Sequence, residues 1–535
     1  MKESLQRMRK FVIIHILLFM VAIVFSDAPW PYALLVVAQL VYIPVLLRMV
    51  CTERDWFWKY YPYVAIPAYT AVVLGQVVST RWDGWIATLY LLFTVYIALY
   101  GITRFLRRGF TNVEEFAIDL GLVYLAMGGG WYVAFVAGID LGFSPLLTWL
   151  TAIHFHYSAF ILPIFIGWIG RLHRSILYRW AVAALLAAPM IVAVGITFSR
   201  WIEMFSVLFY IYGFCAIIWI VWQLSFASSL QKWLLRIAFS ALAVTITFSM
   251  LYVLSNGFGL FSVTIDFMLR FHGVLNCVIF ALVGAIGWSL DVPPSSFVPL
   301  TFPRSGIRGR QVAEKIGQVG GHRGLSDELS VYGVSSGSVS PLIIRFYEHT
   351  LDFRLYASTH WHRWFKPFAF LYSFISKRTQ QINLPLYSDA VEMTGNIFTL
   401  DEGLDEREKV RVWERKVGEQ TIFTALYSQH KTNERMYMNI ALPLPYSTMT
   451  GILELQAVDE GLQLTSKRTD PASDTGVYLS FNNRDLFTLP LQETFFIQET
   501  EKGNLKATHE MWIFSIPFLT IDYSIVYKGA DEKRG

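Results

Sequence analysis

Three histidines lie inside long apolar segments of this chain, where an ionisable side chain is costly and is therefore a candidate for function. His154 and His156 stand in the run Ala-Ile-His-Phe-His-Tyr-Ser, and His272 stands in Arg-Phe-His-Gly. Imidazole is a common ligand of zinc, copper and iron, so all three residues are candidate ligands of a metal ion or a haem. However, His154 and His156 are two positions apart, so on a regular helix they point about 200° away from each other.

Polar residues near these histidines predict a second kind of site. Asn276 follows His272 by four positions, so the two share a helix face, and Asp266 and Arg270 have the same spacing. This pattern is compatible with a polar pocket, near the outer face of a membrane, that binds a small molecule or a proton. Its candidate ligand-binding residues are His154, His156, Tyr157, Arg270, His272 and Asn276. A third interpretation stays open, in which the imidazoles only bond neighbouring helices or an interior water.

The segments that carry these residues are apolar runs of membrane-spanning length. The chain has 535 residues, 54% of them hydrophobic, and a mean hydropathy of +0.44, whereas soluble domains are roughly 45–50% apolar. The excess lies before residue 291, in runs long enough to cross a hydrocarbon layer of about 30 Å. We therefore expect a multi-pass α-helical bundle over residues 1–291. Its ten spans are centred near Met20, Val41, Thr70, Thr94, Leu125, Phe160, Val192, Tyr212, Ala243 and Val278.

The distribution of basic residues predicts the orientation of the bundle, because cytoplasmic loops are enriched in Lys and Arg. The loops on one side of the predicted bundle contain two basic residues, Arg81 and Arg200. The basic residues in the loops on the other side are Arg48, Arg54, Lys59, Arg104, Arg107, Arg108, Arg171, Arg174, Arg179, Lys232 and Arg236. This pattern predicts a cytoplasmic N-terminus. An even number of spans then returns the chain to the cytoplasm.

The second half of the chain reads as a water-soluble domain. Residues 292–340 form a predicted basic linker, rich in Gly and Ser, which either attracts anionic lipid or is simply solvated. Its basic residues are Arg304, Arg308, Arg310, Lys315 and Arg323. Residues 341–529 are expected to form a cytoplasmic α+β domain with a curved antiparallel sheet that could enclose an apolar cavity. Residues 530–535 form a charged tail.

Two helices are predicted at the start of that domain, over Leu342–Leu355 and His360–Lys377. The second helix mixes aromatic with basic residues, which suits a helix lying at the level of lipid headgroups. The alternative is an aromatic face that packs against the following sheet. Confident strands begin at Thr421, just after Trp413-Glu414-Arg415, where Arg415 is expected to pair with a nearby acid.

Charge and motifs exclude several classes of function. A net charge of +4 gives no case for nucleic acid as a partner, which would require a dense basic face. The chain contains no zinc-protease motif, phosphate-binding loop or dinucleotide fingerprint, which counts against zinc proteases, nucleotide enzymes and dehydrogenases. His360 and His362 lack a cysteine or carboxylate at zinc-ligand spacing.

Several of these segments resemble a known family. The runs His154-Phe155-His156-Tyr157 and His272-Gly273-Val274-Leu275-Asn276 are similar to signature segments of the YndJ-like membrane proteins of Bacillus and its relatives. Residues 341–529, with the pattern Trp-x-Arg at Trp413, resemble a bacterial domain of unknown function that also occurs outside that family. The resemblance implies a bacterial plasma membrane, in a Gram-positive cell, and implies no activity.

Two hypotheses of function follow. The first is a non-enzymatic membrane protein that binds a lipid or another apolar small molecule, through the polar pocket among the spans, the β domain, or both. Membrane lipids are its expected partners, with anionic lipid at the basic linker. The alternative is a membrane oxidoreductase that depends on a metal or a haem held by His154, His156 and His272.

Overall fold

The protein is seen in a computed structural model, and it consists of two compact units. The first unit comprises residues 1–105 and 112–297, and the second comprises residues 106–111 and 298–535. The structure describes residues 2–51, 56–260, 262–309, 312, 318–335, 337–386, 389–401, 403–470, 472–481 and 485–530. Arg54, Arg310, Lys315 and the expected tail after Ala530 lie outside these described residues.

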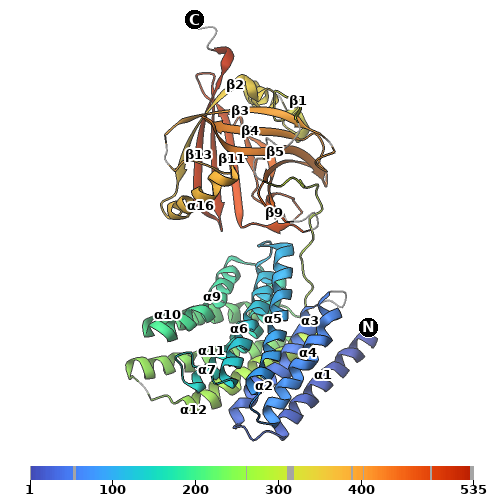
Figure 1. Cartoon of the computed structure of the whole chain (residues 1–535), viewed down its shortest axis with the longest axis vertical. Helices are drawn as coiled ribbons and strands as arrows, with labels where there is room; N and C mark the ends of the chain where they lie inside the picture. Colours follow the sequence, from blue (N-terminus) through green and yellow to red (C-terminus); the bar gives the residue numbers. More distant parts are fainter. Residues whose placement is uncertain are drawn as a thin grey trace. The chain divides into compact units, whose positions relative to one another are not determined.

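The first unit is built from helices (Figure 1). Several stretches that read as single spans in the sequence are α-helices joined to a π-helical or 3₁₀ segment. The helical elements are α1 Lys2–Val24, η1 Trp30–Tyr32, α2 Ala33–Val37, η2 Ala38–Tyr42, α3 Ile43–Val50, α4 Trp56–Val77, α5 Asp83–Arg108, α6 Val113–Val136, α7 Pro145–His156, η3 Tyr157–Ile161, α8 Leu162–Leu172, α9 Ile176–Phe198, α10 Arg200–Gln223, α11 Ser229–Phe258, α12 Ile265–Phe267, η4 Met268–Gly273, η5 Leu275–Leu282 and α13 Val283–Leu290.

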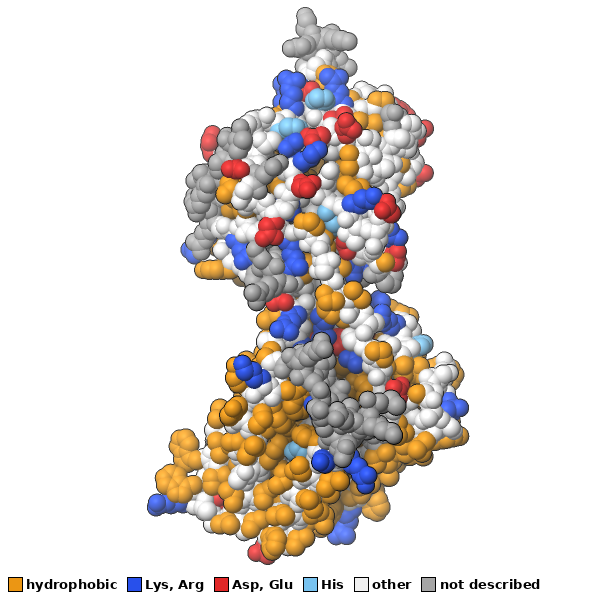
Figure 2. Space-filling view, turned by 90° about the vertical axis from the view of Figure 1, so that its right-hand side faces the viewer, with side chains coloured by type: hydrophobic (Ala, Val, Ile, Leu, Met, Phe, Trp, Pro, Cys, Tyr) orange, Lys and Arg blue, Asp and Glu red, His pale blue; other side chains and the backbone are white. Residues whose placement is uncertain are grey.

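Eight helical stretches within the described residues are long and apolar enough to cross a membrane. They are Trp30–Val50, Asp83–Arg108, Val113–Val136, Pro145–Leu172, Ile176–Gly195, Trp201–Gln223, Ser229–Ser255 and Ile265–Leu290. Helices α1 and α4 are 23 and 22 residues long but are less apolar, because α1 begins with charged residues and α4 contains two prolines, Pro62 and Pro67, among tyrosines and tryptophans. Apolar side chains dominate the visible surface of this unit (Figure 2).

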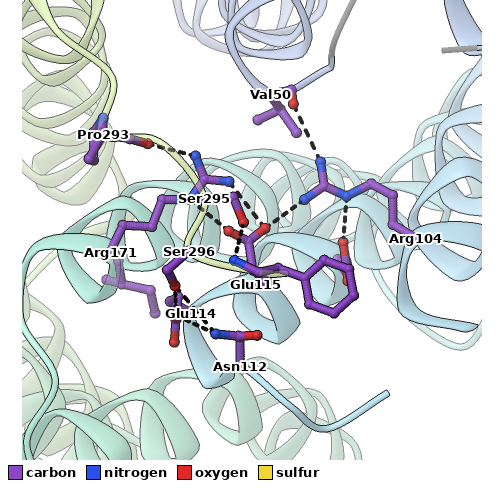
Figure 3. A network of polar contacts seen from close by, with 12 residues as sticks. Val50, Arg104, Asn112, Glu114, Glu115, Arg171, Pro293, Ser295 and Ser296 are labelled. Atoms are coloured by element: carbon purple, nitrogen blue, oxygen red, sulfur yellow. Dashed lines mark hydrogen bonds and ion pairs between the residues drawn. The ribbon is translucent and has the colours of Figure 1, made fainter. Parts of the chain in front are cut away.

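A buried ion-pair network joins several helix ends of the first unit. Glu115, at the start of α6, is 1% exposed and accepts hydrogen bonds from Arg104 of α5 (2.9 Å) and Arg171 of α8 (2.7 Å). Figure 3 shows the two guanidinium groups on opposite sides of this carboxylate. Arg104 also binds Asp119 of α6 at 2.8 Å. Each buried charge therefore has an opposite charge and hydrogen bonds, as burial requires.

The same arginines bind two backbone carbonyls outside these helices. Arg104 Nη1 lies 3.4 Å from the Val50 carbonyl oxygen at the end of α3, and Arg171 Nη1 donates to the Pro293 carbonyl at 2.9 Å, just after α13. Beside them, Glu114 accepts hydrogen bonds from Arg174 at 2.6 Å and from Asn112 at 3.0 Å. The ends of α3, α5, α8 and α13 and the start of α6 thus lie on one side of the bundle.

The second unit is dominated by antiparallel strands (Figure 1). The strands are β1 Gln318–Gly321, β2 Phe353–Trp361, β3 Val391–Leu400, β4 Arg411–Val417, β5 Gln420–Thr432, β6 Arg435–Pro443, β7 Thr448–Val458, β8 Gly461–Thr465, β9 Gly476–Ser480, β10 Phe487–Thr488, β11 Leu491–Glu499, β12 Leu505–Ile513 and β13 Ile516–Tyr527. Two helices accompany them, α15 Pro341–Glu348 and α16 Lys366–Thr379.

The strands close into a barrel. Among the described residues, ten strands form the ring in the order β7-β6-β5-β4-β3-β2-β13-β12-β11-β8, and β8 returns to pair with β7. Leu464 of β8 pairs with Phe495 of β11 on one side and with Leu455 of β7 on the other. The predicted curved antiparallel sheet is confirmed. Closure removes the free edges that an open sheet would leave.

The segment expected to be a linker is part of the second unit. Phe302 is 4% exposed and packs on His430 and Tyr478. Leu325 and Leu329 join the main core of the barrel. The two predicted helices also differ from the structure. The first ends at Glu348 as α15, and β2 occupies Phe353–Trp361 before α16 begins at Lys366. Alternation of apolar residues in β2 places Phe353, Leu355 and Ala357 in the core, which explains why a strand forms there.

Candidate ligand-binding sites

The two histidines of α7 face different surroundings. His156 is fully buried, its Nε2 lies 2.8 Å from the Tyr90 hydroxyl, and its ring stacks on Tyr90 with centroids 5.9 Å apart. His154 is exposed, and its Nδ1 lies 2.7 Å from the Leu150 carbonyl oxygen. The sequence argument that they point apart agrees with this geometry. They do not converge on one ligand.

In the tenth predicted span, polar residues four positions apart lie close together, as their spacing predicts. His272 Nδ1 lies 3.0 Å from the carbonyl oxygen of Thr245 in α11, and its Nε2 lies 3.2 Å from Asn276 Nδ2. His272 lies within electrostatic range of His154. Arg270 is exposed and forms an ion pair with Asp266 at 2.8 Å. His154, His272 and Asn276 therefore lie in one region, and Arg270 is held at its edge.

Three π-helical segments meet near Tyr157, which the sequence predicts as a ligand-binding residue. The Tyr157 hydroxyl donates to the Leu34 carbonyl at 2.7 Å. The Tyr42 hydroxyl of η2 donates to the carbonyl of Cys277 in η5 at 2.9 Å, and the rings of Tyr42 and Tyr157 meet edge to face at 6.1 Å. Single π turns often occur at functional sites. Here they bring η2, η3 and η5 together around two buried tyrosines.

Gln39, in the same η2 segment, is a buried amide. Its side chain is 0% exposed, and neither its Oε1 nor its Nε2 makes a hydrogen bond of good geometry within the described part of the chain. The Tyr90 hydroxyl is the polar group within reach of this amide. An unpaired buried amide is costly, so such a group usually marks a place for water or a polar ligand atom. Gln39, Tyr90 and His156 therefore outline a polar pocket inside the bundle.

A second candidate site lies inside the barrel. Inward-facing side chains from the ring of strands form one apolar core, which includes Leu355, Ile397, Leu453, Ile497 and Ile521. An eight-stranded barrel is just wide enough for side chains to fill or for one small ligand, and the diameter grows with strand number. A ring of ten strands is wider than an eight-stranded one, and here packed apolar side chains occupy much of its interior.

Arg415 introduces a positive charge into this apolar interior. Its guanidinium carbon lies 4.6 Å from the Trp413 ring centroid and 4.4 Å from that of Phe423, which are cation–π distances. Its Nε is buried and has no hydrogen-bond partner among the described residues. No carboxylate of those residues lies within 4.0 Å of it, so the predicted pairing of Arg415 with an acid is not found.

Two tyrosines face the same charge. Burial raises the pKa values of Tyr427 and Tyr523, and the nearby Arg415 guanidinium opposes that rise. Both phenols therefore stay neutral at physiological pH and can donate hydrogen bonds. Thr359, whose partner across the strands is Ile521, is 2% exposed and has an unpaired Oγ1 within the described residues.

A carboxylate lies within electrostatic range of the same two tyrosines. Glu493 Oε2 lies 2.9 Å from His509 Nε2, and their side chains are 19% and 17% exposed, unlike those of a filled core. Gly451 faces this carboxylate, since a Cβ there would lie 2.6 Å from Glu493 Oε1. The interior is therefore apolar along most of its wall, with a positive and a negative group held in place.

No metal centre is formed by the residues that the structure describes, because no group of three His, Cys, Asp or Glu side chains is placed to hold an ion. Sequence reasoning identified His154, His156 and His272 but missed Gln39 and Tyr90. A polar residue inside the second predicted span was the available signal for Gln39. The role of Arg415 could not be recognised without knowing which way its strand faces.

Most of the chain is similar to known proteins. The family described as "YndJ-like protein" matches residues 33–280. A Bacillus subtilis (strain 168) protein, described as "Uncharacterized membrane protein YndJ", is 36% identical over 491 residues, which cover 87% of each chain. No solved structure matches this chain.

Proposed function

The chain belongs to the YndJ-like family of membrane proteins, and on this basis we propose that it is an integral plasma-membrane protein that binds an amphipathic lipid. The barrel interior is the principal binding site. The observation that carries this proposal is the partly buried Arg415 side chain, which lies against two aromatic rings and has no carboxylate within 4.0 Å among the described residues.

The chemistry of the interior selects an acyl or similar apolar chain with one anionic group. Apolar side chains of the wall receive the chain, because burial of apolar surface is favourable at about 25 cal/mol per Å². Arg415 offers two or more N–H groups to a carboxylate or phosphate, and Tyr427 and Tyr523 can donate beside it. A bound anion would lie beside a guanidinium that forms no ion pair within 4.0 Å among the described residues.

The helix-end network supports ten spans rather than eight. Val50 ends α3 and Arg104 lies near the end of α5, yet the two are in contact. If α5 crosses the membrane, α4 must cross in the opposite direction to connect these ends. Helix α1 runs beside α4, with Phe11 against Trp58 and His15 against Tyr69. The later residue of α1 contacts the later residue of α4, so the two helices run in the same direction. This favours α1 as a further span.

The same reasoning supports a cytoplasmic second unit. Pro293, which follows the last span, binds Arg171 on the side where the loops carry most Lys and Arg. That side is cytoplasmic under the positive-inside rule. The N-terminus and the barrel are then both cytoplasmic, and the exposed Arg323 is the basic residue of the predicted linker that can contact anionic lipid.

A pocket among the spans is a second site in this proposal. Gln39 supplies a buried amide that makes no hydrogen bond of good geometry among the described residues, and His156 and Tyr90 lie beside it. His154, Tyr157, His272 and Asn276 remain the predicted ligand-binding residues nearer the outer face, with Arg270 at the edge. The metal- or haem-dependent alternative has no comparable support, because His154 and His156 face different partners.

The test is photo-crosslinking of the full-length protein in nanodiscs. The probe is a palmitic acid with a diazirine in its chain, and the labelled peptides are mapped by mass spectrometry. We expect labelling of inward-facing barrel residues, reduced severalfold in Arg415→Met and unchanged in the exposed control Lys506→Met.

Each alternative has its own outcome. Labelling confined to α2–η2, η3 or η5, and insensitive to Arg415→Met, would move the site to the bundle. Labelling of lipid-facing helix surfaces alone would overturn the proposal for both pockets.

A further inference from the structure

Helix α16 packs against the barrel with its small residues and exposes its large ones. The buried side chains are Ala369, Ser376 and Thr379. The exposed ones are Phe368, Phe370, Leu371, Phe374 and Ile375, each between 53% and 63% exposed. A surface helix of a soluble domain has the opposite arrangement, with its apolar stripe facing the core. The interpretation favoured from the sequence, an aromatic face packed on the sheet, is wrong, because the structure turns this face outward.

The outward face is held in a fixed position. Before the helix, Trp364 Nε1 donates to the Pro517 carbonyl at 2.9 Å. After it, the Gln381 amide exchanges two hydrogen bonds with the backbone of Thr424 in β5, at 3.0 and 3.2 Å. Fixed anchors at both ends mean that the helix cannot roll its apolar face onto the barrel. The exposed face is therefore a stable surface of the second unit.

Basic residues border this face. Arg363 and Lys366 lie at its start, and Lys377 and Arg378 lie in the last turn, all exposed. An apolar face with basic residues around it and a tryptophan at its edge is the pattern of a helix that lies in the headgroup layer of an anionic membrane.

Chain length keeps this helix near a membrane. The last span ends at Leu290, and Phe302 is already buried in the second unit. Twelve residues reach about 40 Å at full extension. The second unit can therefore never move far from the bilayer in which the spans sit.

We propose that the outward face of α16, with Trp364, docks into the anionic lipid surface of the membrane. Docking brings a fixed face of the barrel to the lipid and hides about five large apolar side chains from water. This inference is independent of the ligand proposed for the barrel interior.

The experiment uses the full-length protein, in a Cys215→Ser background, reconstituted in nanodiscs. A nitroxide label is placed at Phe374→Cys or, as the matched control, at Lys502→Cys in the turn between β11 and β12. Strand pairing places that turn at the end of the barrel opposite Trp361, which precedes α16. Collisions of each label with oxygen, which enters lipid, and with a water-soluble nickel complex are measured.

In nanodiscs with phosphatidylglycerol, we expect the ratio of oxygen to nickel collisions to be severalfold higher at position 374 than at 502. Lys366→Glu with Lys377→Glu should lower it, as should discs of phosphatidylcholine alone. Equal ratios at 374 and 502 would overturn the proposal. A label at 374 shielded from both reagents, in detergent as well, would show a protein-covered face, and spin–spin broadening between labelled molecules would show a second copy there. Either result would also overturn it.

Discussion

The guanidinium carbon of Arg415 lies 4.6 Å from the ring centroid of Trp413, inside the barrel. The two residues are two positions apart on β4, so the strand turns both toward the same face. Stacking supports a charge that has no carboxylate partner in the described residues. Under the proposed function, this guanidinium is the group that binds the anionic end of the ligand.

Two substitutions of Arg415 should distinguish the effect of its charge on ligand binding from the effect of its planar guanidinium group. Arg415→Met should weaken binding of a fatty acid by about 10- to 100-fold, the loss expected for a hydrogen bond to a charged group. Arg415→Lys keeps the charge but loses the planar fork, so its loss should be smaller. Binding of the corresponding fatty alcohol should change little in either variant. Equal losses for acid and alcohol would contradict the role of Arg415 as the anion partner. Binding is measured by displacement of a fluorescent fatty acid in nanodiscs.

A side chain at Gly451 should displace the end of Glu493. Its missing Cβ leaves the space that the Glu493 carboxylate occupies, at 2.6 Å from where that atom would lie. Gly451→Ala should cost less than about 1 kcal/mol, because the atom it meets is the far end of a flexible side chain that can move aside. Glu493→Ala in the same chain should recover most of that loss. The Tm of the barrel, followed by near-ultraviolet circular dichroism, is the measurement. Additive losses in the double variant would rule out this contact as the cause.

Much of this architecture could be predicted from the sequence. Apolar runs before residue 291 and short strands after Thr421 indicate a helical membrane half and an antiparallel sheet, and both are found. Closure of the barrel could not be predicted, because it depends on β8 pairing with β7 and also with β11, which lies about 30 residues further along the chain. The burial of Phe302 depends in turn on that barrel.

The candidate sites could be predicted only in part, because the rest also depends on how distant segments of the chain pack together. His154 and His156 were found because a charge-bearing residue stands out in an apolar run, and their divergence follows from helix geometry. Gln39 is polar but uncharged, so the sequence marks it only weakly, and packing is needed to show that its amide makes no hydrogen bond of good geometry among the described residues. The direction of Arg415 depends on register, where it lies opposite Gly395 and Phe423.

Glu115 should be essential for the stability of the first unit. Glu115→Gln leaves Arg104 and Arg171 without their shared carboxylate in a buried site, which costs about 3–5 kcal/mol. Asp266→Asn, which breaks the exposed pair with Arg270, should cost less than about 1 kcal/mol. Thermal unfolding of both variants in the same detergent checks this contrast. Similar Tm values for the two variants would contradict it.

Asp474 should make the barrel sensitive to acid. Burial alone would raise the pKa of this carboxyl, but hydrogen bonds from His430 and Thr432 and the charge of Arg468 lower it below its ordinary value. Its stabilisation is therefore present above the ordinary value of about 3.9 and is lost as pH falls through the lower native pKa. Asp474→Asn should be less stable than the unsubstituted chain at pH 7, and the difference should shrink below about pH 4. Glu419→Gln, in an exposed turn, should show no such convergence. Urea unfolding from pH 3 to pH 7 provides the comparison.

His156 and His154 should behave differently when each is replaced by alanine. His156→Ala removes the partner of the buried Tyr90 hydroxyl and should cost about 1–3 kcal/mol of stability. His154 bonds only a carbonyl of its own helix and is exposed, so His154→Ala should change stability by less than about 0.5 kcal/mol. A shared metal or haem would instead make both variants, and His272→Ala, lose the same bound mass in native mass spectrometry. Because the rings of His154 and His156 face different partners, we expect no such joint loss, and its appearance would revive the oxidoreductase alternative.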